Sequence, residues 1–118
     1  MKGKMLLRVS EKFDSAHQLN DYTGKCSRLH GHTWRLEAYI QVDKLQKNGI
    51  SIDFHDVKSF LREFLPDHRF LNDYLDMKYP TAENLVTYFY KEIKNRFPGL
   101  SKVVLWETEA NGVEYSEV

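Results

Sequence analysis

The chain of 118 residues contains a single cysteine and no excess of charge of either sign. One cysteine cannot form an internal disulfide, which favours a reducing compartment. Lysine and arginine number 17, as do aspartate and glutamate, so nothing indicates electrostatic attraction to nucleic acid or to a membrane. The early apolar run at residues 5–7 is too short for a signal-peptide core, and no apolar stretch reaches about 18 residues. We therefore expect a cytoplasmic protein with neither a nucleic-acid nor a membrane partner.

The remaining composition is that of an ordinary globular domain. Hydrophobic residues make up 42% of the chain and aromatic residues 14%, which argues against disorder. The length suits one domain with a modest core, and no linker, repeat or low-complexity segment divides it. A single domain over residues 1–118 is expected.

Two strands are indicated in the first third of the chain. Within residues 4–14, the odd-numbered positions hold Met5, Leu7, Val9 and Phe13, which would lie on one face of a strand. Residues 32–42 alternate between apolar and other side chains with a period of two, which is typical of a half-buried strand. The apolar members of this second strand are Trp34, Leu36, Ala38, Ile40 and Val42. His32 shares their parity, so it should open this strand.

Two helices and two further strands follow. Asp53 is a good helix N-cap, and an apolar stripe with helical spacing runs from residue 54 until Pro66 stops it. Its members are Phe54, Val57, Phe60, Leu61, Phe64 and Leu65. A second helix is capped by Thr81 and ends before Pro98-Gly99. Val103 and Leu105 mark a third strand, and Asn111-Gly112 is a hairpin-turn signal before a fourth strand at residues 113–115.

The order β-β-α-α-β-β predicts an α+β fold, a four-stranded antiparallel sheet with two helices on one face. The other face would carry Arg35, Glu37, Tyr39 and Gln41. Four strands leave two edges open, which proteins usually cover or close. Joining edges between subunits would close them, so we expect an oligomer.

Three histidines have the spacing of a metal site built on strands. His30 and His32 lie two residues apart, so in an extended chain both point to one face. His17, on a neighbouring strand, would complete a set of three imidazoles. Three protein ligands leave one zinc position open, as in catalytic sites. The alternative is that the histidines are separate, because a lone His-x-His is weak evidence.

Cys26 precedes the histidine pair in a polar segment. A lone cysteine is often a small buried hydrophobic residue. Here Lys25 and Arg28 flank it and would favour a thiolate. Cys26 can then be a fourth zinc ligand, which would make the site structural, or a base or nucleophile beside the metal. The spacing does not decide between these roles.

Two further candidates for the functional site are the Asp67-His68 pair and Glu107. Asp67-His68 can be a solvated loop pair, or an aspartate that orients a proton-shuttling histidine. Glu107 shares the parity of Val103 and Leu105 and should approach the buried face. It can form an internal salt bridge, or accept two hydrogen bonds from a guanidine-like amino-pyrimidine edge.

Taken together, these residues resemble the 6-pyruvoyl tetrahydropterin synthase family over nearly the whole chain. The resemblance rests on His17, the segment Cys26-Ser27-Arg28-Leu29-His30-Gly31-His32, Asp67-His68, Leu71-Asn72, the segment at residues 80–85 and Glu107. Three residues separate Cys26 from His30, a spacing similar to that of the 6-carboxytetrahydropterin synthase branch, which serves queuosine and other deazapurine biosynthesis.

The resemblance implies a tunnelling fold in which trimers close a β-barrel and stack as a homohexamer with active sites between subunits. It implies one Zn²⁺ per subunit, held by His17, His30 and His32. Cys26 would accept a proton, and His68 oriented by Asp67 would relay it. Glu107 would anchor the pterin ring and is also counted among the catalytic residues of the relay. The implied reaction is that of a lyase converting 7,8-dihydroneopterin triphosphate to 6-carboxy-5,6,7,8-tetrahydropterin, acetaldehyde and triphosphate. Lys25 and Arg28 are candidates for triphosphate contact.

The chain departs from the family pattern in two places. Pro66 precedes Asp67, where a hydrophobic Leu-Asp-His run is more usual, and this can shift the relay loop. Asp14 and Ser15 replace the commonest small residues before His17, which puts first-strand phosphate contacts in doubt. Two other functions stay open: 6-pyruvoyl tetrahydropterin synthase activity, and a non-catalytic zinc-binding oligomerisation module in which Cys26 is a ligand.

Overall fold

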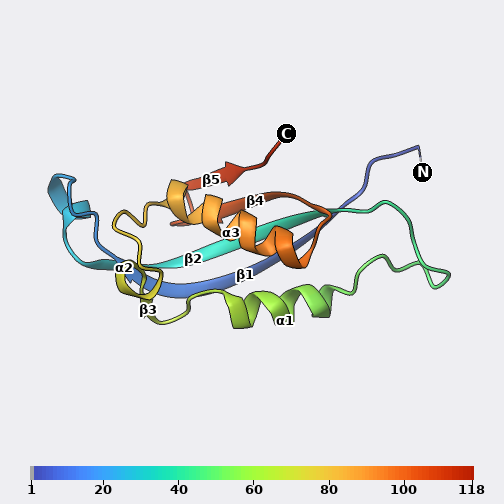
Figure 1. The fold of residues 1–118 in the computed structure, drawn as a ribbon, viewed down its shortest axis with the longest axis horizontal. Helices are drawn as coiled ribbons and strands as arrows, with labels where there is room; N and C mark the ends of the chain where they lie inside the picture. Colours follow the sequence, from blue (N-terminus) through green and yellow to red (C-terminus); the bar gives the residue numbers. More distant parts are fainter. Residues whose placement is uncertain (1) are drawn as a thin grey trace.

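The computed structural model describes residues 2–118, except for the side chain of Cys26. The molecule is elongated, with extents of 53 × 26 × 24 Å, and two long strands run along it (Figure 1). The elements in order are β1 (Leu6–His17), η1 (Gly24–Ser27), β2 (His30–Gln41), α1 (Phe54–Phe64), β3 (Arg69–Phe70), α2 (Leu71–Tyr74), α3 (Ala82–Arg96), β4 (Leu100–Trp106) and β5 (Gly112–Tyr115).

The sheet has five strands in the order β3-β1-β2-β4-β5, one more than the sequence predicted. The additional strand, β3, pairs in parallel with β1 through Ser15 and Ala16 only. Two residues are too few to show any periodicity, which is why this strand was missed. The other pairings are antiparallel, and β1 and β2 pair over twelve residues, from Leu6 opposite Gln41 to His17 opposite His30.

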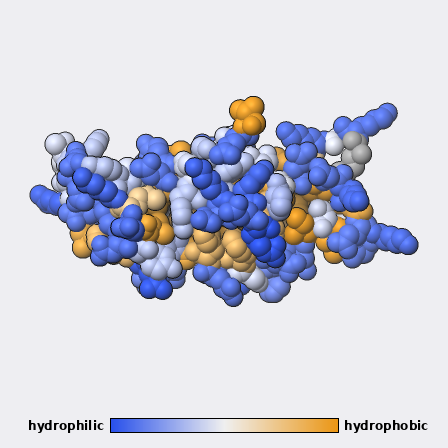
Figure 2. Space-filling view, in the orientation of Figure 1, coloured by the Kyte–Doolittle hydropathy of each residue, from blue (hydrophilic) through white to orange (hydrophobic). Residues whose placement is uncertain are grey.

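One face of the sheet packs against the helices, as the alternation predicted. Trp34, Leu36, Ala38 and Ile40 of β2 are completely buried there, together with Val57 and Leu61 of α1 and Leu85, Phe89 and Ile93 of α3. The viewed surface of α1 and α3 is largely hydrophilic, with hydrophobic residues visible between them (Figure 2). Burial of these apolar side chains is the main force that holds the helices on the sheet.

Both principal helices begin at the predicted caps. The Asp53 side chain accepts a hydrogen bond from the backbone N–H of His55 at 2.9 Å, and the Thr81 hydroxyl accepts one from Asn84 N–H at 3.1 Å. The apolar stripe of α1 is not buried along its whole length, because Phe54, the first residue of the helix, is 55% exposed.

Asn111-Gly112 does not form a two-residue hairpin turn. Residues 107–111 make a longer loop, and Gly112 is the first residue of β5. A Cβ atom at Gly112 would lie 2.8 Å from Cε3 of Trp106 and 2.9 Å from the carbonyl oxygen of Leu105. The glycine is therefore required by close packing against β4, not by a turn.

The helix-free face of the sheet is polar, as predicted, but it contains one buried carboxylate. Glu37 is only 6% exposed and accepts hydrogen bonds from Trp106 Nε1 at 2.8 Å and Arg35 Nη1 at 3.1 Å. Strands β3 and β5 are left at the edges of the sheet. Within residues 2–118, no helix combines the length and hydropathy needed to cross a membrane.

Candidate functional site

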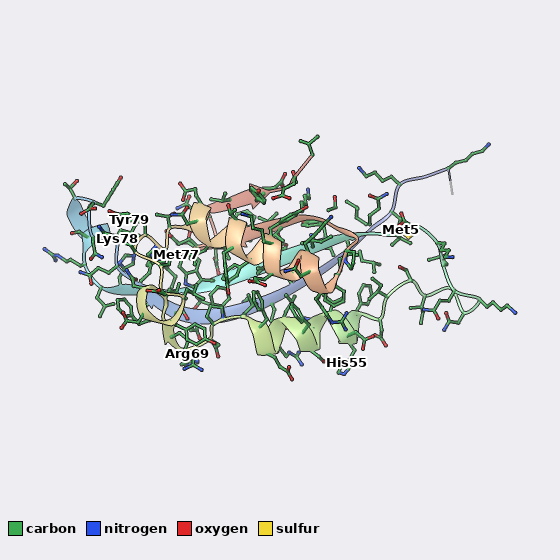
Figure 3. The ribbon with its side chains drawn as sticks, viewed as in Figure 1. Met5, His55, Arg69, Met77, Lys78 and Tyr79 are labelled. Atoms are coloured by element: carbon green, nitrogen blue, oxygen red, sulfur yellow. The ribbon has the colours of Figure 1, made fainter. Side chains whose placement is uncertain are left out.

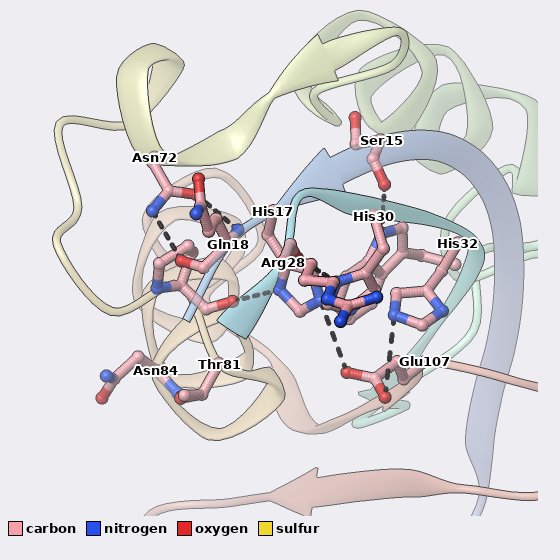
Figure 4. A network of polar contacts seen from close by, with 12 residues as sticks. Ser15, His17, Gln18, Arg28, His30, His32, Asn72, Thr81, Asn84 and Glu107 are labelled. Carbon is pink, nitrogen blue, oxygen red and sulfur yellow. Dashed lines mark hydrogen bonds and ion pairs between the residues drawn. The ribbon is translucent and has the colours of Figure 1, made fainter. Parts of the chain in front are cut away.

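The pairing of β1 with β2 brings the three histidines together, as the sequence predicted. His17 and His30 are directly opposite each other at the end of the two strands, and His32 lies two residues further along β2. The three imidazoles pack against one another, and one ring nitrogen from each lies within 4.8 Å of the others (Figure 4). The rings of His17 and His32 also pack against the Trp34 ring. His17 is fully buried, so this end of the core is an imidazole cluster rather than an apolar one.

Hydrogen bonds to backbone carbonyls orient two of the imidazoles. His17 Nδ1 donates to the carbonyl oxygen of Pro80 at 2.8 Å, and His30 Nδ1 donates to that of Arg28 at 2.7 Å. A carbonyl can only accept, so both Nδ1 atoms carry a proton, and in the neutral form of each ring its Nε2 atom presents a lone pair. These two Nε2 atoms face each other at 3.0 Å. Two lone pairs at that distance repel unless a cation or a proton lies between them.

His32 adds a nitrogen that lacks a partner. Among residues 2–118, its Nε2 is a buried side-chain nitrogen with no hydrogen-bond partner, which ordinarily costs free energy. Zn–N bonds of about 2.0–2.1 Å in tetrahedral arrangement place nitrogens roughly 3.3 Å apart. The 3.0 Å between the Nε2 atoms of His17 and His30 is close to that spacing. The three residues therefore fit a divalent metal ion, and imidazole donors suit zinc, copper, iron or nickel.

The protonation states also favour a ligand role. Burial lowers the pKa of His17, although its hydrogen bond to Pro80 acts in the opposite direction. Burial likewise lowers the pKa of His32, against the attraction of Glu107. Only neutral imidazole has a lone pair to donate to a metal. A lowered pKa keeps these side chains in that form over a wider pH range.

Glu107 approaches the buried face, as its parity predicted. It follows β4 directly, and its carboxylate oxygens lie 3.9 Å from His17 Nε2 and 3.8 Å from His32 Nε2. Both distances exceed that of a hydrogen bond, and the side chain is 32% exposed. The carboxylate is thus beside the histidine cluster and open to solvent, where it can accept hydrogen bonds from a ligand.

Asp67 and His68 form the predicted pair in the loop between α1 and β3. Asp67 Oδ2 accepts a hydrogen bond from His68 Nδ1 at 2.9 Å, and this bond raises the pKa of His68. The pKa of Asp67 is lowered, first by the backbone N–H of Asp14 and then by His68. An open hollow of about 580 Å³ is lined by both His32 and His68. One member of the pair, His68, and one member of the histidine cluster, His32, therefore border the same hollow.

The cysteine loop is described only in part. Cys26 belongs to η1, but its side chain lies outside the described residues, so the proposed base is not placed. Lys25 and Arg28 are exposed on either side of it. The carbonyl of Arg28 orients His30, which makes this loop part of the histidine cluster's support.

Gln18 and Asn72 make supporting contacts that the sequence did not predict. The Asn72 side chain accepts a hydrogen bond from Gln18 N–H at 3.0 Å and donates one to the Gln18 carbonyl at 2.8 Å. The Gln18 side chain in turn donates to the carbonyl of Ser27 at 3.0 Å, next to Cys26 (Figure 4). This chain of contacts joins α2, the end of β1 and the cysteine loop. Polar residues 54 positions apart give no sequence signal of such a contact.

The sequence matches one protein family model and several named relatives. A family model described as 6-pyruvoyl tetrahydropterin synthase matches residues 6–118. A 6-carboxy-5,6,7,8-tetrahydropterin synthase from Synechocystis is 34% identical over 111 residues, which cover 87% of this chain and 86% of the relative. A protein of the same name from Aquifex aeolicus is 34% identical over 124 residues, covering 79% of this chain and 76% of the relative.

The fold is also found among solved structures. That of Caenorhabditis elegans 6-pyruvoyl tetrahydropterin synthase superposes with a TM-score of 0.85 at 22% identity, covering 98% of this chain and 97% of the other. At that identity the likeness establishes the fold alone.

Proposed function

The chain belongs to the 6-pyruvoyl tetrahydropterin synthase family, and we propose that it is a zinc-dependent lyase acting on 7,8-dihydroneopterin triphosphate. The products would be 6-carboxy-5,6,7,8-tetrahydropterin, acetaldehyde and triphosphate, in queuosine or deazapurine biosynthesis. The convergence of His17, His30 and His32 on one point is the observation that carries the proposal. Relatives named 6-carboxy-5,6,7,8-tetrahydropterin synthase support the choice of product.

The three imidazoles would hold the metal through Nε2 of His17, His30 and His32. Bound there, a zinc ion supplies a Lewis acid that polarises oxygen atoms of the substrate side chain. The backbone carbonyls of Pro80 and Arg28 would select the neutral tautomer in which Nε2 of His17 and His30 is free to bind the metal, and they orient both rings toward the site.

The remaining residues would move protons and hold the substrate. Cys26, as a thiolate favoured by neighbouring cations, would remove a proton from a side-chain carbon. His68, held by Asp67, would relay that proton. Glu107 would accept hydrogen bonds from the amino-pyrimidine edge of the pterin, and this role fits its exposed carboxylate beside the cluster. Lys25 and Arg28 would contact the triphosphate.

We also propose that the working form is a homohexamer of two stacked trimers with active sites between subunits. Two sheet edges, β3 and β5, and a polar helix-free face support an assembly that closes a barrel. The His68 side chain is 77% exposed in the single chain, which leaves it accessible to a neighbouring subunit's Cys26. Sedimentation velocity of the purified protein tests the stoichiometry, and a monomer at working concentration would contradict it.

Incubation of the metal-loaded protein with 7,8-dihydroneopterin triphosphate, followed by mass spectrometry, tests the activity. Release of acetaldehyde with the 6-carboxy product is expected. Triphosphate elimination without acetaldehyde would instead identify a 6-pyruvoyl tetrahydropterin synthase, the activity named for the Caenorhabditis elegans structure. No consumption of substrate would refute the lyase assignment.

Replacement of Cys26 separates the enzyme from a zinc-binding oligomerisation module. In Cys26→Ala the enzyme proposal expects full zinc content and loss of turnover, because the thiol acts on substrate and is not a ligand. A module in which the sulfur binds zinc would lose metal affinity and oligomeric state instead. Metal content by atomic emission and oligomer mass decide between these outcomes.

A further inference from the structure

A buried serine on β1 contacts the main chain on both sides of the Asp67-His68 pair. Ser15 Oγ donates a hydrogen bond to the carbonyl oxygen of Pro66 and accepts one from the backbone N–H of Arg69 at 3.2 Å. The residue is 6% exposed, so water does not substitute readily for either partner. One hydroxyl has a single proton to donate, and here both its donor and an acceptor site are used. Ser15 therefore joins the two ends of the loop segment that contains the pair.

The preceding residue, Asp14, contacts the pair itself. Its backbone N–H donates to Asp67 Oδ1 at 2.8 Å, and its carbonyl accepts from His68 N–H at 2.5 Å. Its own carboxylate accepts a hydrogen bond from the Thr33 hydroxyl of β2 at 2.6 Å. Four consecutive loop residues, 66–69, are thus bonded to two consecutive residues of β1.

His68 has a backbone conformation that needs such support. Its φ angle is 56°, in the left-handed region that residues other than glycine rarely adopt. A residue stays in this region only when its surroundings hold it there. The direction of the imidazole follows from this backbone conformation, so the groups that hold residues 66–69 also set where His68 points.

We infer that Ser15 is a positioning residue for His68, and that its hydroxyl holds the relay loop in the geometry that proton transfer requires. The inference rests on the proposed function, because it assigns Ser15 a part in that reaction. β1 also carries His17, two residues further on, so one strand supports both the metal ligand and the relay. Ser15 and Pro66, two of the three residues that depart from the family pattern around these motifs, are bonded to each other.

A pair of substitutions of equal shape isolates the hydroxyl. Ser15→Thr keeps an Oγ, whereas Ser15→Val replaces it by a methyl group, and both suit a strand. Any cost of the added bulk is common to the two variants. Ser10→Ala, five residues earlier on the same strand, is the control for a generic serine loss on β1.

Three measurements are made on each variant: its zinc content, its steady-state kinetics (kcat and KM) on the pterin triphosphate, and the pKa of the His68 imidazole by NMR titration. The charged groups that face His68 are the carboxylates of Asp67 and Asp14. In Ser15→Val, kcat should fall by about 10- to 100-fold with zinc content and KM unchanged, because a displaced relay group affects the chemical step. The His68 pKa should fall toward its ordinary value as the contact with Asp67 loosens. Ser15→Thr and Ser10→Ala should resemble the wild type in all three measurements.

The same His68 pKa and the same kcat in Ser15→Val and Ser15→Thr would overturn the inference. If Ser15→Val does not fold, Ser15→Ala, which removes the hydroxyl without adding volume, takes its place in comparison with the wild type. The NMR titration needs no substrate, so it decides the role of Ser15 even if the wild type proves inactive on the pterin. Inactivity of the wild type would count against the proposed function alone.

Discussion

Removal of the metal should lower the melting temperature of the wild-type protein by about 8–13 °C. A ligand present at about 100 times its Kd stabilises the folded state by about 2.7 kcal/mol. A domain of this length shifts its melting temperature by roughly 3–5 °C for each kcal/mol. The physical source is the cluster itself, where the lone pairs of His17 and His30 face each other at 3.0 Å and gain a shared cation.

The substitution His32→Ala should abolish this gain while changing the metal-free protein little. In the metal-free state the His32 Nε2 is buried without a hydrogen-bond partner among residues 2–118. Deleting an unsatisfied buried nitrogen recovers about 1–3 kcal/mol, which offsets the packing lost with the ring. The variant should therefore melt near the metal-free wild type, with or without zinc.

Thermal melts followed by circular dichroism, in chelator and in zinc, measure these shifts. His55→Ala is the control, because His55 is exposed on α1, away from the end of the molecule where the histidines of β1 and β2 converge (Figure 3). It should keep the full zinc-dependent shift. A His32→Ala protein that gains as much from zinc as the wild type would contradict the ligand assignment.

Three other substitutions test the fold and the supporting contacts. Gly112→Ala should lower the free energy of unfolding by about 1–3 kcal/mol in urea titrations, because the new Cβ would lie 2.8 Å from the Trp106 ring. Asp67→Asn should lower the NMR-measured pKa of His68, because it removes the carboxylate whose hydrogen bond raises it. The Asp67-His68 pair stabilises the folded state at pH values above the unfolded pKa of aspartate, and this stabilisation is lost as pH rises through the folded pKa of His68. The decrease in the free energy of unfolding caused by Asp67→Asn should therefore be larger near pH 5.5 than at strongly alkaline pH. Asn72→Ala should speed tryptic cleavage in the cysteine loop, because its amide makes two hydrogen bonds where β1 ends.

Matched controls accompany these substitutions. Gly3→Ala adds a Cβ that meets no atom within 4 Å, so it should leave stability unchanged. Asn95→Ala, on the exposed side of α3, should be cleaved at the wild-type rate. An unaltered His68 pKa in Asp67→Asn would show that the carboxylate is not its main partner.

The long elements were predictable because their side-chain pattern repeats. Trp34 through Ile40 alternate over enough residues to identify β2 and its buried face, and Asp53 and Thr81 mark the helix starts by a local capping rule. The strand β3 was not predictable, since its two residues pair with β1 only because Ser15 and the loop before it hold them there.

The convergence of the three histidines was predictable for the same reason, while the contacts that support them were not. The spacing of His30 and His32 shows a shared face in the sequence itself. The carbonyl of Pro80 that orients His17 comes from 63 residues away, and a backbone oxygen has no sequence signature. Contacts of this kind depend on the tertiary fold, so they can be found only in the structure.

The histidine cluster lies at the final residue pair of the β1–β2 ladder, so its geometry depends on the register of the two strands. His17 is opposite His30 only if all twelve pairs, beginning with Leu6 and Gln41, are in register. A slip of one residue would turn the imidazoles of one strand toward the opposite side of the sheet. If the three histidines bind a metal ion as proposed, its affinity reports on correct alignment of β1 and β2 along their whole length, and a misaligned chain would bind the ion weakly.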